Sequence, residues 1–180
     1  VGKTTEIFDT DEIPRGNVNI EKMGTLPTVF KKDGTISAGN SCALCDAASA
    51  IVLMSEEKAE SMGVKPMAVI RSYASSGLDP KYMGLGPVEA TNQALKKAGM
   101  TLADIELIEL NEAFAAQYLA VEREIKFDRS ITNVHGGAIA LAKILTTLLY
   151  ALKTYDKQIG LATLCIGGGQ GVSVIVERIR

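Results

Sequence analysis

The residues with the clearest chemical potential are a cysteine and the glycines that follow it, Cys165-Ile-Gly-Gly-Gly-Gln-Gly171. The cysteine ends an apolar stretch that predicts a strand, so its thiol would lie beside backbone that a ligand can approach closely. Glycine N–H groups in such a turn can stabilise an oxyanion, because no side chain blocks access to them. The same residues are also compatible with a buried structural cysteine before a glycine-rich hairpin.

Two further segments place polar side chains where predicted strands end. Asn111 and Glu112 stand between a strand and a helix, the usual edge for functional side chains in α/β folds. Asn111 could instead be a helix N-cap, which is common at such junctions. His135, the single histidine, precedes two glycines and suggests a general base. A hydrogen-bonded structural histidine in a turn is the alternative.

Cys42 and Cys45 form a C-x-x-C pair, a pattern found in zinc sites and redox dithiols. A metal site is not expected, because the chain has neither a second such pair nor a second histidine. The three cysteines fit a reducing compartment, and we expect a cytoplasmic protein. The chain starts without an initiator Met and with no targeting signal, as a segment of a longer protein would, so organellar targeting stays open.

The composition excludes several classes of protein. Apolar residues make up 47% and charged residues 22%, the balance of an ordinary soluble domain. A net charge of -2 gives no electrostatic reason to expect nucleic acid or an acidic membrane as a partner. No apolar run approaches the ~20 residues that a membrane span needs.

The elements that must position these residues alternate between strand and helix beyond Gly63, which predicts an α/β layered sheet. Residues 1–36 are polar and interrupted by proline and glycine, so we expect an extended arm. Strands are predicted over 67–73, 105–110, 131–134, 160–166 and 172–178, and helices over 87–99, 112–124 and 141–155.

Taken together, the three segments resemble thiolases, the family that joins or splits acyl groups on coenzyme A through a cysteine thioester. Asn-Glu-Ala-Phe-Ala at 111–115, Asn-Val-x-Gly-Gly-Ala-Ile-Ala-Leu at 133–141 and Cys-x-Gly-Gly-Gly-x-Gly at 165–171 occur there in this order. Segments 10–15, 30–40 and 83–87 also look like thiolase segments.

The resemblance implies a thiolase-like layered αβαβα fold, of which this chain is the C-terminal half. Residues 1–36 would be the tail of the loop domain. Residues 37–62 would form the last strand and helix of the N-terminal domain, and 63–180 the C-terminal domain.

The resemblance also implies roles for individual residues. Cys165 matches the cysteine that moves a proton to and from the substrate α-carbon, and Gly167 matches a backbone oxyanion donor. Asn111 matches the residue that holds a water in the other oxyanion hole. Met83 and Phe114 match residues that line the acyl pocket. The cysteine that carries the acyl group lies in the N-terminal half of the family, outside these 180 residues.

Several positions depart from the family pattern. Cys42 falls where relatives commonly have a serine near the pantetheine of coenzyme A, and Cys45 and His135 fall where asparagine is common. The family's catalytic histidine follows in Gly-His-Pro-x-Gly-x-Ser-Gly, whereas here Leu141 runs directly into Ala142. We therefore expect a skipped loop, because a connection normally takes about 2–6 residues and no capping residue precedes the helix. The alternative is one unbroken apolar helix over 137–155.

We accordingly expect an acyl-CoA acyltransferase of the acetoacetyl-CoA thiolase type, which condenses two acetyl-CoA or cleaves 3-ketoacyl-CoA. Coenzyme A would be a substrate, with no bound cofactor and no metal. A degradative 3-ketoacyl-CoA thiolase of longer chain preference is the alternative within the family. A non-catalytic thiolase-like chain that binds acyl-CoA or a partner is the alternative outside catalysis. The expected partners are the N-terminal half and further copies in a homodimer or homotetramer.

Overall fold

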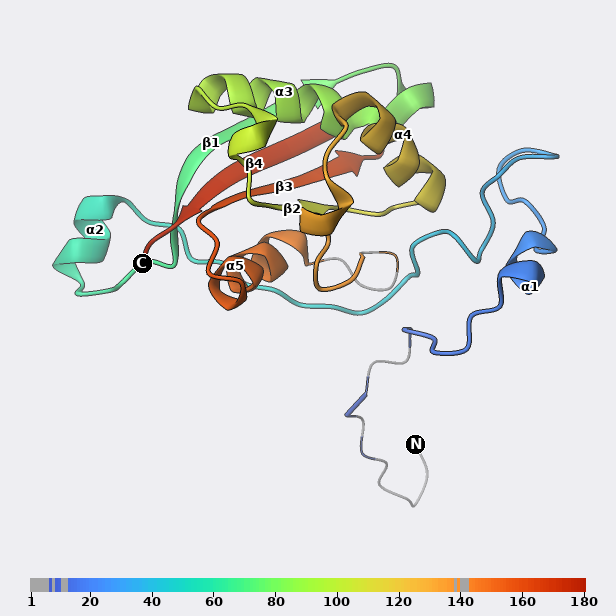
Figure 1. Cartoon of the computed structure of the whole chain (residues 1–180), viewed down its shortest axis with the longest axis horizontal. Helices are drawn as coiled ribbons and strands as arrows, with labels where there is room; N and C mark the ends of the chain where they lie inside the picture. Colours follow the sequence, from blue (N-terminus) through green and yellow to red (C-terminus); the bar gives the residue numbers. More distant parts are fainter. Residues whose placement is uncertain (1–6, 8, 11–12, 138, 140–142) are drawn as a thin grey trace.

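Four strands form one mixed sheet in the order β1–β4–β3–β2 in the computed structural model, which describes residues 7, 9–10, 13–137, 139 and 143–180 (Figure 1). The outer strand β1 (Ala68–Gly77) pairs antiparallel with β4 (Gln170–Arg178), which pairs antiparallel with β3 (Ile159–Ile166). β3 then pairs in parallel with β2 (Leu107–Leu110), so both strands end at the same edge of the sheet. Side chains that follow β2 and β3 are therefore brought together.

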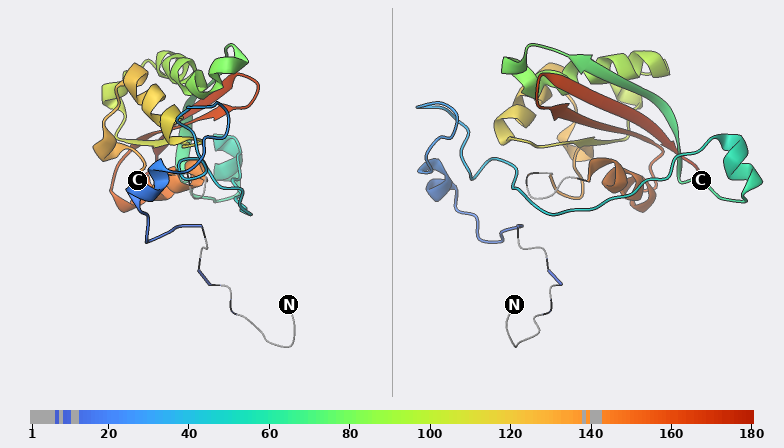
Figure 2. Two further views of the ribbon diagram at one scale, coloured as in Figure 1. Left: turned by 90° about the vertical axis from the view of Figure 1, so that its right-hand side faces the viewer. Right: turned by 180° about the vertical axis from the view of Figure 1, so that it is seen from behind.

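Helices cover the two faces of this sheet (Figures 1 and 2). α3 (Gly86–Ala98) and α4 (Ala115–Ile125) pack on one face through a core that includes Ile108, Leu110 and Val121. α5 (Ile144–Thr154) packs on the other face through Leu107, Leu148 and neighbouring residues. The α/β layered fold predicted from the sequence is confirmed.

Short helical turns complete the connections. These are α1 (Ile20–Gly24), α2 (Glu56–Ser61), η1 (Pro80–Leu85), η2 (Leu102–Asp104) and η3 (Arg129–Ile131). No helix in the described part of the chain is both long and apolar enough to span a membrane.

The boundaries of α3 follow from local chemistry. Pro87 stands in its first turn, where the missing N–H costs nothing. Gly99 follows its last residue with φ 66°, the left-handed conformation that glycine adopts without strain. Both features agree with the helix predicted over 87–99.

α5 starts later than predicted. It begins at Ile144, and no side chain accepts a hydrogen bond at its N-terminus. Gly136 and Gly137 lie outside any helix, so the alternative of one unbroken helix from residue 137 is wrong. The glycine turn has a φ of 95° at Gly136, which interrupts a helix. The predicted break between Leu141 and Ala142 lies outside the described residues.

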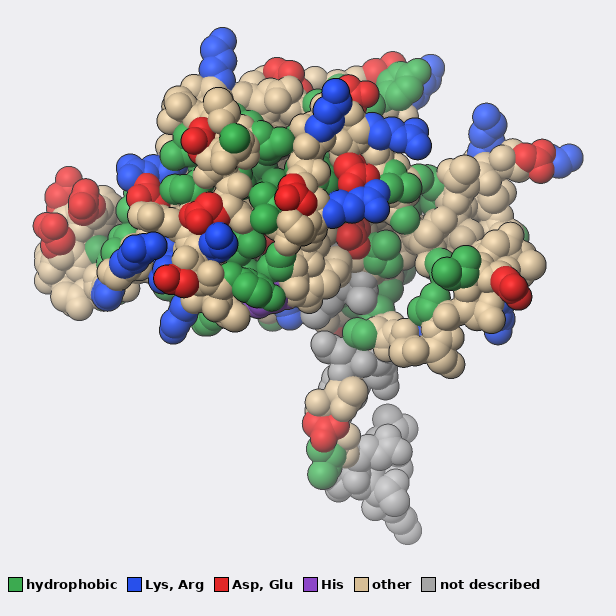
Figure 3. Space-filling model, viewed as in Figure 1, with side chains coloured by type: hydrophobic (Ala, Val, Ile, Leu, Met, Phe, Trp, Pro, Cys, Tyr) green, Lys and Arg blue, Asp and Glu red, His purple; other side chains and the backbone are tan. Residues whose placement is uncertain are grey.

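The apolar stretch at 47–54 forms no strand, although a strand was expected there. A strand needs a neighbouring strand to satisfy its backbone, and the described residues form none beside this segment. Val52 and Leu53 consequently expose 80% and 70% of their surface. The helix that follows, α2, forms as expected with Ser55 as its N-cap, and acidic side chains gather on it (Figure 3).

Candidate active site

Cys165 and Asn111 lie at the edge of the sheet where β3 and β2 end. Leu110 pairs with Thr163, and the Asn111 N–H donates to the Thr163 carbonyl oxygen at 3.0 Å, which extends the ladder by one step. Cys165 follows two residues later and pairs with Gly171 on β4. The parallel pairing thus brings these two predicted site residues onto neighbouring strand ends.

The glycines after Cys165 fix its turn against the segment that contains Met83. A Cβ built on Gly171 would lie 2.1 Å from the Gly86 carbonyl oxygen, and one built on Gly169 would lie 2.2 Å from the Leu78 carbonyl oxygen. These contacts are backbone against backbone, so only glycine fits. Gly167 has open space around it, which leaves its backbone accessible to a substrate oxygen.

The Cys165 side chain is partly buried, and this burial raises the pKa of its thiol. A smaller contribution in the same direction comes from Cys42. A raised pKa keeps Cys165 in its protonated form near neutral pH. A thiol in that state can donate a proton but is not a ready nucleophile.

The segment that carries Cys42 pairs with the start of α4. The Cys42 N–H donates to the Ala113 carbonyl oxygen at 2.9 Å, and the Ala115 N–H donates to the Asn40 carbonyl oxygen at 2.9 Å. Phe114, between these contacts, meets the edge of the Phe30 ring with centroids 5.7 Å apart. The predicted binding residues Cys42 and Phe114 are thus neighbours, and Phe30 joins them unpredicted.

Buried polar atoms without a hydrogen-bond partner are concentrated at this edge. In the described part of the chain they are Glu109 Oε1, Asn111 Oδ1 and both amide atoms of Gln117. All four lie within nine residues of sequence around the junction of β2 and α4. Unsatisfied buried polar groups are rare in folded proteins and mark functional sites when they cluster.

Asn111 is not the cap of the helix that follows it. α4 begins at Ala115, and Phe114 is the residue at its N-cap position. The helix was predicted from Glu112, and the capping alternative for Asn111 depended on that early start. Because the pairing with residues 40–42 holds Phe114 extended, the helix starts at Ala115 and the Asn111 side chain is left for another role.

Asn133 and Glu112 form a polar contact that the sequence did not reveal. The Asn133 side-chain Nδ2 donates to Glu112 Oε1 and to the Leu110 carbonyl oxygen, both at 3.0 Å. Asn133 itself has φ 51°, the left-handed region in which asparagine is enriched. The available signal was an asparagine three residues before a glycine, because asparagine is common in the left-handed conformation at turns.

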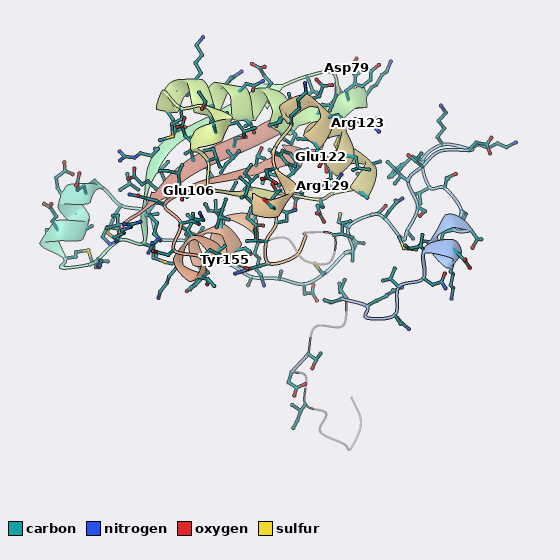
Figure 4. All side chains as sticks on the ribbon, in the orientation of Figure 1. Asp79, Glu106, Glu122, Arg123, Arg129 and Tyr155 are labelled. Carbon is teal, nitrogen blue, oxygen red and sulfur yellow. The ribbon has the colours of Figure 1, made fainter. Side chains whose placement is uncertain are left out.

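His135 contacts the residue that follows α5. Its ring packs on the Tyr155 ring with centroids 5.4 Å apart. Tyr155 lies just after α5, near Lys157, which forms an ion pair with Glu106 ahead of β2 (Figure 4). The ring of His135 is thus directed toward the end of the sheet where β2 begins, whereas Cys165 is near the end of β3. The structure does not bring this histidine to the candidate site as a base.

Among the described residues, the acidic side chains, cysteines and histidine do not gather in threes in a way that could hold a metal ion. Cys42 and Cys45 are both free thiols in an extended, exposed segment. They lack the helix N-terminus that usually lowers a thiol pKa in redox motifs.

Known proteins resemble this chain over nearly its whole length. It is 51% identical to the acetyl-CoA acetyltransferase of Escherichia coli (strain K12), covering 99% of this chain and 47% of the relative. It is also 51% identical to the acetyl-CoA acetyltransferase of Syntrophomonas wolfei, covering 96% of this chain and 46% of the relative. The chain spans about half the length of the curated relatives it matches.

Solved structures agree with the fold. The acetyl-CoA acetyltransferase of Bacillus anthracis superposes with a TM-score of 0.92 at 42% identity, covering 98% of this chain and 47% of that chain. Human mitochondrial 3-ketoacyl-CoA thiolase in complex with CoA gives a TM-score of 0.89 at 45% identity, covering 96% of this chain and 46% of that chain.

The alignment with the Escherichia coli relative also reveals an internal difference. It extends over 186 positions, whereas 99% of 180 residues is about 178, so about eight aligned positions have no residue in this chain. Over the aligned length the relative therefore has about eight residues more than this chain.

Two family models match the chain, one before residue 58 and one after residue 63. Residues 1–57 match the family described as "Thiolase, N-terminal domain", and residues 64–178 match "Thiolase, C-terminal domain". The second match alone covers more than half of the chain. The chain belongs to the thiolase family.

Proposed function

We propose that this chain is part of an acetyl-CoA acetyltransferase that condenses two acetyl-CoA molecules, or cleaves 3-ketoacyl-CoA with coenzyme A, through an acyl-cysteine. One observation carries the proposal: a protonated, partly buried thiol at Cys165 and an unpartnered amide oxygen at Asn111 occupy neighbouring strand ends. The two relatives named acetyl-CoA acetyltransferase, each 51% identical, support this choice of reaction.

In the proposed mechanism Cys165 works on the carbon next to the thioester. Its thiolate form takes a proton from the α-carbon of acetyl-CoA, and the resulting enolate attacks the acyl group on the nucleophilic cysteine. In the reverse direction the Cys165 thiol returns this proton to the leaving enolate. The raised pKa of Cys165 suits it to this acid role. The nucleophilic cysteine would come from the N-terminal half, outside these 180 residues.

The remaining site residues would stabilise charge and bind substrate. The backbone N–H of Gly167 and a water held by Asn111 would each stabilise an oxyanion, the kind of contact that contributes most to acyl transfer. Met83 and Phe114 would line the acyl pocket, and Cys42 would lie near the pantetheine. Coenzyme A enters as a substrate, so the proposal requires neither a bound cofactor nor a metal.

The proposed protein acts in the cytoplasm as a homodimer or homotetramer, in which the N-terminal half covers the exposed segment at 47–54. The exposure of Val52 and Leu53 supports a covering half, because apolar side chains in a row favour burial. The three free cysteines support a reducing compartment.

The test is carried out on the full-length protein. Acetyl-CoA is added, and the product acetoacetyl-CoA is measured for the unchanged protein, Cys165→Ala and the control Cys45→Ala. We expect Cys165→Ala to lose condensation but still to exchange labelled coenzyme A with acetyl-CoA, since exchange needs no proton transfer at the α-carbon. Cys45→Ala should retain both activities. Undiminished condensation by Cys165→Ala would refute the assigned role.

A further inference from the structure

Glu109 is a buried carboxyl group that the proposed reaction does not use. It is 4% exposed and lies in β2 between Ile108 and Leu110. Those two side chains enter the core beneath α3 and α4, so Glu109 is on the opposite face with Leu107, toward α5. Its Oε1 has no hydrogen-bond partner within the described residues. A charged carboxylate in this position would be strongly disfavoured.

Two other glutamates of this domain, Glu106 and Glu122, have partners for their carboxylates. Glu106 accepts hydrogen bonds from the backbone N–H groups of Gln158 and Ile159. Glu122 pairs with Arg129 on the surface of the molecule, as Figure 4 shows. Both have a lowered pKa for these reasons. Glu109 has a raised pKa instead, and among the described residues its Oε1 has no hydrogen-bond donor.

Glu112, the acid whose charge acts on Glu109, is held in position by two contacts. Asn133 donates to its Oε1, and the carboxylate lies against the backbone of Gly137. A Cβ built on Gly137 would lie 1.9 Å from Glu112 Oε2, so the carboxylate fills the space that a side chain would need. Glu112 therefore links the end of β2 to the glycine turn at 136–137.

Asn133 extends this link to the backbone beside Asn111. Its amide accepts from the Leu110 N–H at 2.9 Å and donates to the Leu110 carbonyl oxygen at 3.0 Å. The Asn133 backbone N–H also donates to the Ile108 carbonyl oxygen at 2.8 Å. The position of the residue after Leu110 consequently depends on Asn133, and Asn133 shares its side-chain amide with Glu112.

Burial raises the pKa of Glu109 to about 7, and the charge of Glu112 adds to the effect. The surrounding elements carry other titratable groups. Lys153 is on α5, Lys143 lies just before it, and Asp46 belongs to the segment that contacts α5 through Ser49. His135 follows Asn133, and Cys165 is at the end of β3. Of these groups, none shifts the pKa of Glu109. Glu112 is thus the charge to which Glu109 is coupled.

We propose that Glu109 is a positioning residue of this site that acts through Glu112 and is protonated while the site is assembled. With its proton in place, Glu112 stays on Asn133 and the end of β2 is fixed beside Asn111. When Glu109 loses its proton, two carboxylates repel each other and the contact between Glu112 and Asn133 loosens. The effect on turnover rests on the proposed function, but the loosening can be measured without any substrate.

The first experiment measures hydrogen–deuterium exchange of peptides that cover residues 131–137 in the full-length protein at pH 6 and pH 8. The exchange rate at each pH is divided by the intrinsic exchange rate at that pH. A pKa of about 7 makes Glu109 about one-tenth ionised at pH 6 and about nine-tenths ionised at pH 8. Corrected exchange should increase at pH 8 in the unchanged protein and stay constant in Glu109→Gln, which mimics the protonated acid.

Two further variants make this result specific. Glu112→Gln keeps an oxygen for Asn133 but removes the negative charge that repels Glu109. Its corrected hydrogen exchange should therefore increase less between pH 6 and pH 8 than that of the unchanged protein. Glu124→Gln is the matched control, because Glu124 is exposed on α4, and it should behave as the unchanged protein does. An increase of the same size in Glu109→Gln, or its loss in Glu124→Gln, would overturn the proposal.

The second experiment compares kinetics of Glu109→Gln and the unchanged protein with acetyl-CoA. The kcat of the variant relative to the unchanged protein should rise between pH 6 and pH 8, while the ratio of their KM values stays constant. A kcat ratio that does not change with pH would contradict the proposal. If the full-length protein does not condense acetyl-CoA at all, the proposed function fails, and hydrogen exchange alone decides the role of Glu109.

Discussion

Asn133 binds Leu110 through both backbone polar groups of that residue, accepting from its N–H at 2.9 Å and donating to its carbonyl oxygen at 3.0 Å. A side-chain amide used in this way replaces a neighbouring strand at the point where β2 ends. The next residue is Asn111, so the contact sets the backbone from which a candidate catalytic side chain extends.

Asn133→Ala should therefore destabilise the protein and slow it as well. The Leu110 N–H is fully buried and would lose its acceptor, which costs about 1–3 kcal/mol of unfolding free energy. Alanine also tolerates the φ of 51° less well than asparagine. Urea unfolding measures the loss, with Asn92→Ala on the exposed side of α3 as the control. Equal stability of both variants would show that the Leu110 contact contributes nothing.

Asn111→Ala should slow turnover without destabilising the protein. Removing one element of an oxyanion hole typically lowers turnover by ~10²–10³-fold. Stability should change little, because Asn111 Oδ1 has no partner to lose and α4 is not capped by this residue. Steady-state kinetics and thermal unfolding of the full-length protein check both statements. Unchanged kinetics together with a lowered Tm would instead make Asn111 a structural residue.

The titration of Glu109 should make the unfolding free energy of the protein depend on pH. Its pKa of about 7 in the folded state lies above the ordinary 4.5, so the folded protein binds this proton more tightly than the unfolded chain. The contribution of Glu109 to stability is complete below pH 4.5 and is lost as pH rises through 7. The loss amounts to about 3 kcal/mol at 1.36 kcal/mol per pKa unit.

Glu109→Gln has no proton to lose. The unfolding free energy of the variant minus that of the unchanged protein should therefore increase between pH 5 and pH 8. The measurement is urea unfolding of both proteins across this range, and the difference between them removes the titration of all other groups. A difference that is constant with pH would mean that Glu109 titrates normally.

Gly171→Ala should displace the turn that carries Cys165. The new methyl group would lie 2.1 Å from the Gly86 carbonyl oxygen, and a backbone atom cannot move aside as a side chain can. Overpacking of this kind costs about 1–3 kcal/mol. Gly77→Ala is the control, because nothing lies within 4 Å of a Cβ at that position in β1. A Gly171→Ala protein with full stability and activity would contradict the tight packing of this turn.

The sequence predicted those parts of the molecule that depend on local chemistry. α3 has its proline and glycine where expected, and β3 and β4 close around the glycines after Cys165. The raised pKa of Glu109 could not be predicted, because it depends on burial in the folded chain and on the charge of Glu112. The start of α4 was misplaced for a similar reason, since residues 40–42 hold the preceding chain extended.

The segment at 47–54 shows the other limit of prediction from sequence. The thiolase resemblance implied a strand within residues 37–62, but a strand forms only where another strand is available to pair with it. The same residues expose their apolar side chains here. The sequence therefore predicts an element that this part of the protein cannot form alone.

The last prediction concerns the junction between Leu141 and Ala142, which we expect not to be a direct peptide bond in the protein as it is made. Three observations motivate it. α5 begins at Ile144 without a side-chain cap, and about eight aligned positions of the Escherichia coli relative have no residue here. The only histidine, His135, packs on Tyr155, so a histidine that could activate the nucleophilic cysteine has still to be supplied.

Tryptic digestion and tandem mass spectrometry of the purified full-length protein decide the question. Cleavage after Arg129 and Lys143 would release residues 130–143 as one peptide if the junction is direct. We expect instead a heavier peptide, or two, containing a second histidine after Leu141. That histidine would supply the base that activates the nucleophilic cysteine. Detection of the 130–143 peptide at its simple mass would show that the block is deleted. The non-catalytic, acyl-CoA-binding alternative would then fit the protein better than the enzyme.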